Sequence, residues 1–155
     1  MTIRDTDKGF RALVDSFKAN PKTTITVGIH AREGAAAHKG SKFGETVADV
    51  ATLQEFGADG IPQRSFLRAW FDENQAQTAE ATKRMLQSVM QGKRTKQSAL
   101  ELLGQAFVGQ IQKRIAQGIA PPNSPDTIAR KGSSTPLIDT GQMRSAITYA
   151  VEVKS

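Results

Sequence analysis

The sequence predicts an α+β fold in a single domain over residues 1–155, with several helices packed on a small, mostly antiparallel sheet. Two segments, 23–29 and 147–153, have the alternating apolar pattern and the β-branched residues of strands. Between them lie segments with apolar residues at helical spacing, including one long central helix. Because a two-stranded sheet is marginally stable alone, we expect helices or neighbouring subunits to pack against it.

The composition limits both the setting and the chemistry of the protein. The chain has 155 residues and no cysteine, which excludes disulfides and thiolate metal sites. No segment has the ~18 continuous apolar residues of a membrane span, and the N-terminus lacks the apolar core of a signal peptide. We therefore expect a protein that is made and used in a reducing cytoplasm and has no membrane partner.

The net charge of +6 comes entirely from the second part of the chain. Residues 1–60 carry eight basic and eight acidic side chains, whereas residues 61–155 carry thirteen basic and seven acidic ones. Such an excess permits non-specific contact with DNA. The basic residues are scattered, with few aromatic residues between them, which does not favour a stacking platform for single strands.

The first 45 residues predict a helix, a strand and a loop. Residues 7–18 have apolar side chains at helical spacing, and Asn20-Pro21 ends this helix because proline cannot continue it. The strand over residues 23–29 follows. Residues 30–44 contain small residues and three glycines without apolar periodicity, which predicts a long mobile loop over about residues 30–45.

Two histidines in this loop, His30 and His38, raise the possibility of a metal site. A zinc site needs at least three protein ligands, and neither a cysteine nor a third ligand at helical spacing accompanies them. Gly40-Ser-Lys also has the wrong order for a phosphate-binding loop. We therefore predict no metal and no cofactor. Separately, we assign Lys39 and Lys42 of this loop as candidate interaction residues.

Two helices are predicted after the loop. The first covers residues 46–56, where apolar residues share one face, and it ends at Gly57. The second, a long helix, follows the turn at residues 57–62, with Ser65 as its cap. Its start and its end near Val89 are apolar, whereas its centre is polar and rich in alanine. That centre fits either an exposed face or contact with another helix through the alanines.

A further helix begins near Thr95 and ends at Gly118. Its apolar stripe is typical of a core or a subunit interface and consists of Leu100, Leu103, Phe107, Ile111 and Ile115. Residues 119–125 then predict an extended, proline-stiffened connection. Residues 125–132 predict one or two helical turns.

The last segment, residues 136–153, predicts a capped helical turn that leads into a strand. Asp139 and Thr140 carry side-chain oxygens that cap helix N-termini, and Gly141 permits an unusual backbone angle. One helical turn over residues 142–145 precedes the strand. This segment is a structural element, because it contains no nucleophile–base pair and no metal cluster.

The sequence shows no catalytic constellation. The closest grouping of acidic residues is Glu55, Asp59, Asp72 and Glu73, and adjacent acids near a helix start are typical of solvated, dipole-favoured pairs. No serine lies in a Gly-x-Ser-x-Gly elbow, so the convergent nucleophile, base and orienting group of an enzyme are missing. We predict that the protein is not an enzyme, and a small hydrolase is the disfavoured alternative.

Three segments, taken in order, resemble a known family. They are Val50-Ala-Thr-Leu-Gln-Glu-Phe-Gly57, Ile61-Pro-Gln-Arg-Ser-Phe-Leu-Arg68 and Pro136-Leu-Ile-Asp-Thr-Gly-Gln-Met-Arg-Ser-Ala-Ile147. With Thr127-Ile-Ala-Arg-Lys-Gly132, they resemble the HK97 gp10-like and Mu virion-morphogenesis group of tail-component and neck proteins of tailed bacteriophages. The resemblance covers roughly residues 47–153.

The resemblance implies a virion structural protein at the head–tail joint, a neck or tail-completion component with a tail-terminator-like fold. It implies a homo-oligomeric ring, with six subunits expected, that binds adjacent head-completion and tail-tube or terminator proteins. It also implies synthesis in a bacterial cytoplasm, no catalysis and no cofactor. A tail terminator that caps the tail tube is the first alternative, and a basic DNA-binding module is the second.

The motif residues divide into a structural group and an interaction group. The structural group is Glu55, Phe56, Gly57, Pro62, Phe66, Asp139, Thr140 and Gly141. Within these segments we expect Phe56, Phe66, Leu67 and Ile138 in the core. Arg64, Arg68 and Arg144 form the interaction group, because a guanidinium can bind a carboxylate across a subunit interface. A local salt bridge or a solvated arginine is the alternative for each of them.

Overall fold

The computed structural model describes residues 22–39, 44–132, 134–137 and 141–154, together with positions 11, 14, 15 and 18. The helix predicted over residues 7–18 lies mostly outside these residues. Lys42, Ile138, Asp139 and Thr140 also lie outside them, and with them the predicted cap of the last helical turn. In the part of the chain that the structure describes, no helix is long and apolar enough to cross a bilayer.

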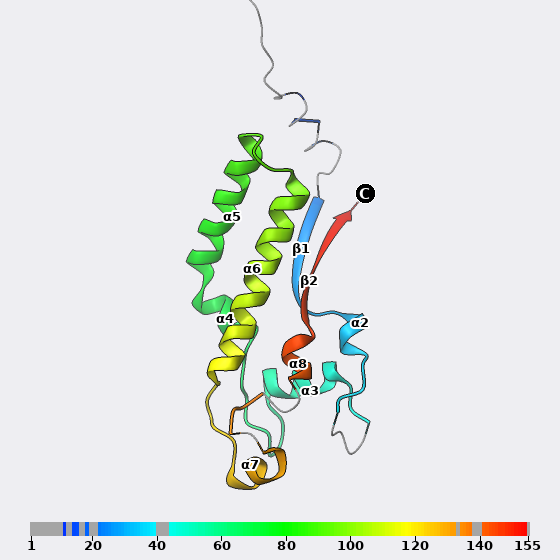
Figure 1. The fold of residues 1–155 in the computed structure, drawn as a ribbon, viewed down its shortest axis with the longest axis vertical. Coiled ribbons are helices and arrows are strands. Elements are labelled where there is room, and N and C mark those ends of the chain that lie inside the picture. Colours follow the sequence, from blue (N-terminus) through cyan, green and yellow to red (C-terminus); the bar gives the residue numbers. More distant parts are fainter. Residues whose placement is uncertain are drawn as a thin grey trace, which may run out of the picture.

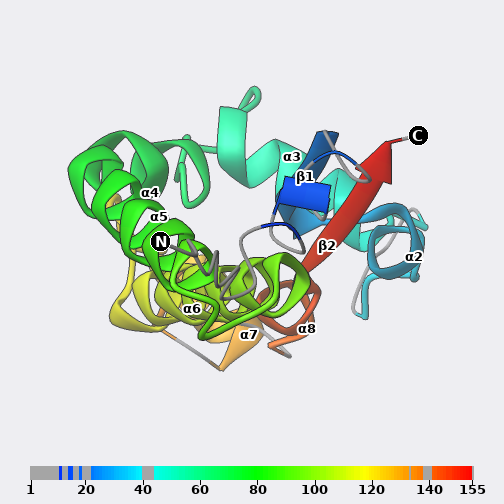
Figure 2. The same ribbon diagram turned by 90° about the horizontal axis from the view of Figure 1, so that it is seen from above.

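The described residues form an α+β fold with two strands and seven helices, which confirms the predicted fold class (Figure 1). In chain order the elements are β1 (Lys22–Ile29), α2 (Ala31–Gly34), α3 (Val47–Phe56), α4 (Arg68–Glu73), α5 (Gln75–Met90), α6 (Lys96–Gln117), α7 (Pro125–Lys131), α8 (Gln142–Ser145) and β2 (Ile147–Lys154). The longest described helix is α6, with 22 residues, and not the helix predicted to start at Ser65. The sheet and α5 pack on different sides of α6, as the view from above also shows (Figure 2).

The two predicted strands pair with each other in an antiparallel ladder that runs from Lys22 opposite Lys154 to Ile29 opposite Ile147. The cross-strand pairs Ile25–Val151 and Val27–Tyr149 lie on the face toward α6, and the alternate positions, which include Thr24, Thr26 and Thr148, lie on the other face. The described sheet has only these two strands, so each strand leaves one backbone edge unpaired.

Helix α6 packs tightly against the sheet at Gly104. A Cβ atom at this position would lie 2.5 Å from the ring of Tyr149 and 2.9 Å from Cδ1 of Ile25. Gln105 supports the same contact, because its Nε2 donates to the Tyr149 hydroxyl at 3.4 Å. The absence of a side chain at position 104 therefore sets the distance between helix and sheet.

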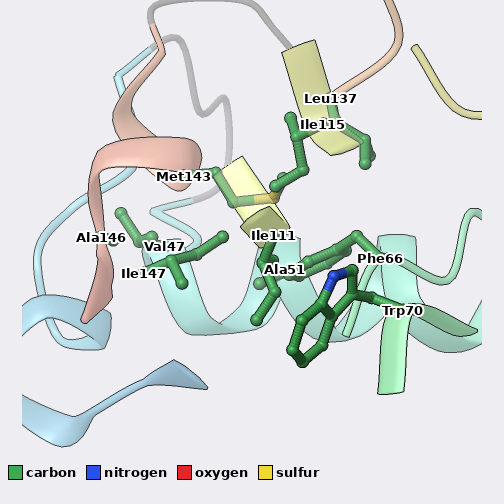
Figure 3. Packing of buried hydrophobic residues seen from close by; sticks show 10 residues of the cluster. All are labelled: Val47, Ala51, Phe66, Trp70, Ile111, Ile115, Leu137, Met143, Ala146 and Ile147. Carbon is green, nitrogen blue, oxygen red and sulfur yellow. The ribbon is translucent and has the colours of Figure 1, made fainter. Parts of the chain in front are cut away.

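One hydrophobic core joins segments from distant parts of the chain (Figure 3). Its buried residues are Val47, Ala51, Phe66, Trp70, Ile111, Ile115, Leu137, Met143, Ala146 and Ile147. Trp70 extends the core along α6 through a tilted contact with Phe107, with ring centroids 5.6 Å apart. Each fully buried large apolar side chain stabilises the fold by about 1.5–3 kcal/mol. Helix α8 and the start of β2 thus close a core that α3, α4 and α6 begin.

Helix α3 forms where the sequence predicts it. Thr46 and Asp49 make a reciprocal capping box: the Asp49 N–H donates to Oγ1 of Thr46 at 3.2 Å, and the Thr46 N–H donates to Oδ2 of Asp49 at 2.9 Å. The helix ends at Gly57, whose φ of 77° is in the left-handed region that favours glycine. Gly141, with a φ of 73°, likewise adopts the unusual angle predicted for it.

The predicted loop over residues 30–44 is more regular than expected within its described part. Residues 31–34 form α2, and Ala37 pairs with Thr46 in an isolated bridge. The small residues serve close packing, because a Cβ atom at Gly34 would lie only 3.0 Å from that of Ala48. The described part of this segment therefore packs against α3.

The single long helix predicted from Ser65 to about Val89 is divided at Asn74. The carbonyl of Trp70 receives both the Asn74 N–H, at 3.1 Å, and the Asn74 side-chain amide, at 2.7 Å. A side chain that joins the helical ladder in this way bends or breaks a helix. Ser65 does accept from the Ala69 N–H at 3.1 Å, as a capping side chain does, although α4 begins at Arg68.

We predict opposite effects for alanine at two glycines of α6. Gly104→Ala would push against the Tyr149 ring and lower the free energy of unfolding by about 1–3 kcal/mol. Gly109→Ala is the matched control, because no atom lies within 4 Å of the added Cβ, and it should raise that free energy by about 0.5–1 kcal/mol. Urea unfolding measures both changes, and equal effects at the two positions would contradict this account of the helix–sheet contact.

Candidate interaction site

The carboxylate of Glu55 joins the end of α3 to the start of α4. Glu55 is only 5% exposed, and its two oxygens accept five hydrogen bonds. They come from the hydroxyl of Ser65 at 2.6 Å and from the backbone N–H groups of Phe66, Leu67 and Arg68 at 2.8, 3.0 and 3.1 Å. The Arg68 Nε also donates to it, at 3.1 Å. Glu55 therefore satisfies N–H groups that the first turn of a helix leaves open.

These contacts keep Glu55 ionised. Burial raises the pKa of the Glu55 carboxyl, but the hydrogen bonds from Ser65 and from the backbone of residues 66–68 outweigh it, so the pKa lies below its ordinary value. A carboxylate with a low pKa and occupied oxygens is unsuited to accept a proton from a substrate at neutral pH. Glu55 is therefore a structural anion.

Arg64 points into the protein and does not form part of the surface. Its residue is 7% exposed, and it donates from Nε to the carbonyl of Pro121 at 2.7 Å and from Nη2 to that of Pro122 at 3.1 Å. Nη1 donates to Oε1 of Gln54 at 3.2 Å. Burial lowers the pKa of Arg64, yet a guanidinium stays protonated in proteins. The expected role in subunit contact is therefore wrong for Arg64, because its donors are used inside the monomer.

Arg68 and Phe56 face the solvent together. The Arg68 guanidinium carbon lies 4.4 Å from the centre of the Phe56 ring, and its Nη2 donates to the Glu55 carbonyl at 3.3 Å. The side chain of Arg68 is 52% exposed and Phe56 is 58% exposed, so the prediction of Phe56 as a core residue is wrong. Phe56 ends α3 on the solvent side, where Arg68 covers one face of its ring.

Phe71 extends this surface by one helical turn. It lies three residues after Arg68 on α4 and is 55% exposed. We call the surface of Phe56, Arg68 and Phe71 the aromatic–arginine patch. Two of its members belong to the motif segments, whereas Phe71 was missed because an apolar residue near a helix start is usually assigned to the core.

An open groove of about 640 Å³ borders the patch. Its lining residues are Gln63, Ser65, Arg68, Ala69, Asp72, Arg114, Gln117, Gly118, Ile119 and Ala120. Arg114 is paired in the groove with Glu73, with Nη2 at 2.9 Å from Oε1 and Nη1 against Oε2. The hydrogen bond from Arg114 lowers the pKa of the Glu73 carboxyl. Because carboxylates neutralise both Arg68 and Arg114, the groove does not favour anions.

Arg144 lies in a different place, beside the C-terminal half of α6. A shallow groove of about 340 Å³ is lined by Gly109, Gln112, Lys113, Ala116, Arg144 and Ser145. Gln112 ties α8 to α6 by donating to the carbonyl of Arg144 at 3.2 Å. Two of the predicted interaction residues, Arg68 and Arg144, therefore belong to separate surfaces. Lys113 was missed because a single lysine on the polar face of a helix gives no signal of its own.

The remaining candidates form no common site. Lys39 is exposed, and its backbone N–H donates to Oε1 of Gln142 at 2.9 Å, which holds the loop against α8. His30 bridges Oγ1 of Thr26 and Oγ1 of Thr148, at 2.9 Å each, on the sheet face away from α6. Within the described ranges, no three histidine, aspartate or glutamate side chains are grouped to hold a metal ion.

Comparison with protein-family models, with curated protein sequences and with solved structures gave no significant match.

We predict that Glu55→Gln lowers the free energy of unfolding by about 3 kcal/mol at pH 7, because the neutral amide replaces an anion that five donors surround. Glu80→Gln, at an exposed ion pair on α5, is the control and should change stability by no more than about 0.5 kcal/mol.

A comparison of the wild type with Glu55→Gln also tests the pKa of Glu55. The pKa of Glu55 is lower in the folded chain than in the unfolded chain, so its stabilising effect is complete above about pH 4.3 and is lost as the pH falls through the folded pKa. Urea unfolding from pH 7 to 3 should therefore show the difference between wild type and Glu55→Gln shrinking at acid pH. A difference that stays constant would contradict the assigned charge.

Proposed function

We propose that the protein is a structural component of a tailed-bacteriophage virion at the head–tail joint, a neck or tail-completion protein. In this proposal it acts by forming a homo-oligomeric ring, with six subunits expected, and by binding adjacent head-completion and tail proteins. The proposal rests on the three motif segments, whose first two segments meet at Glu55 and whose third completes the shared core.

The observation that carries the proposal is the aromatic–arginine patch. Two of its three residues, Phe56 and Arg68, belong to the motif segments, yet their side chains are more than half exposed. The buried motif residues Glu55, Arg64 and Phe66 explain why that local structure forms, but folding does not require an exposed phenylalanine. An exposed aromatic side chain built on a rigid internal network is better suited to binding another protein.

The patch has the chemistry of a protein-interaction hot spot. Aromatic residues and arginine are enriched at such centres, and Arg68 is already held by Glu55 and Phe56. A pre-ordered side chain loses little conformational entropy on binding. The Nη1 of Arg68 makes no hydrogen bond with a described residue, so it is free to donate to an uncharged acceptor, such as a carbonyl, on a neighbouring subunit.

The sheet supports assembly in a second way. Each of β1 and β2 leaves one backbone edge open within the described sheet, and such edges readily pair with another chain. A patch on α4 and an edge of the sheet are different surfaces of the subunit. Contacts between different surfaces are heterologous, and they form a closed ring when the rotation between subunits divides the circle.

Particles made without this protein test its place in the virion. Unjoined heads and tails would support the neck assignment, and tails of uncontrolled length would support the alternative of a tail terminator. Mass spectrometry of purified virions provides the independent check. A protein that is absent from particles, and whose loss leaves them intact and infectious, would contradict both roles.

We predict that Phe71→Ser prevents assembly without unfolding the subunit, because truncation of a hot-spot residue costs a binding interface about 2 kcal/mol or more. Met90→Ser is the matched control, since Met90 is an exposed apolar residue at the far end of α5. Native mass spectrometry and negative-stain imaging measure the assembly. Urea unfolding of Phe71→Ser should stay within about 0.5 kcal/mol of wild type.

If Phe71→Ser forms rings at the same protein concentration as the wild type, the patch is not a contact between subunits of the ring. Rings that persist in both variants, with loss of virion incorporation in Phe71→Ser alone, would assign the patch to an adjacent head or tail protein.

A further inference from the structure

The groove between α6 and α8 contains two cationic side chains, Lys113 and Arg144. Lys113 comes from the exposed face of α6 and Arg144 from the single turn of α8. Neither side chain makes an ion pair or a hydrogen bond with a described residue. The residues that line the groove include no carboxylate.

This groove differs from the surroundings of three other arginines on the helices. Arg68 is paired with Glu55, Arg84 with Glu80 and Arg114 with Glu73. Each of those charges is neutralised within the subunit, whereas Arg144 and Lys113 present two uncompensated positive charges in a concave surface. Such a surface raises the local concentration of anions.

The position of Arg144 is fixed by the fold. Gln112 donates from Nε2 to the carbonyl of Arg144 at 3.2 Å and to that of Ile147 at 3.5 Å. Met143, the residue before Arg144, is buried in the core. These contacts hold the backbone of α8 against α6, so the two cations are brought together before a ligand arrives.

The remaining lining residues suit a polymer with a charged backbone. Gly109 has no side chain and Ala116 has a small one, which allows a backbone to approach α6 closely, and the exposed residue Ser145 lies next to Arg144. Arginine, lysine and serine are among the side chains that contact DNA phosphates. The groove volume of about 340 Å³ is also larger than one side-chain carboxylate fills.

We propose that the α6–α8 groove binds the phosphate backbone of double-stranded DNA without sequence preference, with Lys113 and Arg144 as the phosphate contacts. Residues 61–155 carry the whole positive excess of the chain, which favours approach of DNA from this part of the protein. No base-reading contact is involved, because phosphate contacts carry no sequence information.

The test is the salt dependence of binding to a fluorescein-labelled duplex of about 30 base pairs, measured by anisotropy between about 50 and 200 mM salt. Lys113→Gln with Arg144→Gln should weaken binding more than ~10-fold at the lower salt. The slope of log affinity against log salt should become less steep by about 1.8, since each lost phosphate contact removes about 0.9.

Lys83→Gln with Lys93→Gln is the control, because it removes the same net charge from α5 and the α5–α6 turn. It should leave the slope within about 0.5 of wild type, since no phosphate contact is lost. If both double variants lose the same DNA affinity and salt slope, net charge alone attracts the DNA, and the assignment of the α6–α8 groove as the binding site is overturned. Absence of DNA binding by the wild-type protein at the lower salt would also overturn it.

A third outcome separates DNA from a protein partner. If the Lys113 and Arg144 double variant binds DNA like wild type but no longer self-associates, the groove takes a carboxylate of a neighbouring subunit, and the proposal is wrong. Assembly through Phe71 is tested independently, because Phe71 lies on α4 and contributes nothing to this groove.

Discussion

The buried carboxylate of Glu55 sets the main constraint on this fold. An ionised carboxylate is stable in a protein interior only when donors replace the water that it loses, and here five hydrogen bonds do so. Three of them come from consecutive backbone N–H groups, so the chain from Phe66 to Arg68 must wrap around the end of α3. This path fixes the direction of α4 and carries Phe66 and Trp70 into the core.

The same network explains why neighbouring motif residues have opposite roles. Arg64 points inward and donates to the carbonyls of Pro121 and Pro122, whereas Arg68 contacts the Glu55 carboxylate and remains at the surface. Phe56 follows Glu55 directly and therefore faces the solvent. A short stretch of sequence thus builds a rigid interior and an exposed patch at once, which is the physical basis of the proposed assembly surface.

Helix α6 makes different contacts on three of its sides. One face packs on the sheet through Gly104 and Tyr149, another pairs Arg114 with Glu73, and a third forms the groove with α8. Because the proposed subunit contact and the proposed DNA contact lie on different elements, one subunit can engage both partners simultaneously. The two proposals therefore fail or succeed separately.

Local patterns determined the elements of this protein, and long-range contacts decided its surfaces. Alternation predicted β1 and β2, helical spacing and caps predicted α3 and α6, and the positive φ angles of Gly57 and Gly141 followed from residue type. The break at Asn74 was not predicted, because the alanine-rich sequence around it favours a continuous helix. Which arginines are buried, paired or open depends on partners such as Pro121, which lies 57 residues from Arg64. Likewise, only the packing of α8 on α6 brings Arg144 to Lys113, since periodicity reports the face of one element and not what another element places beside it.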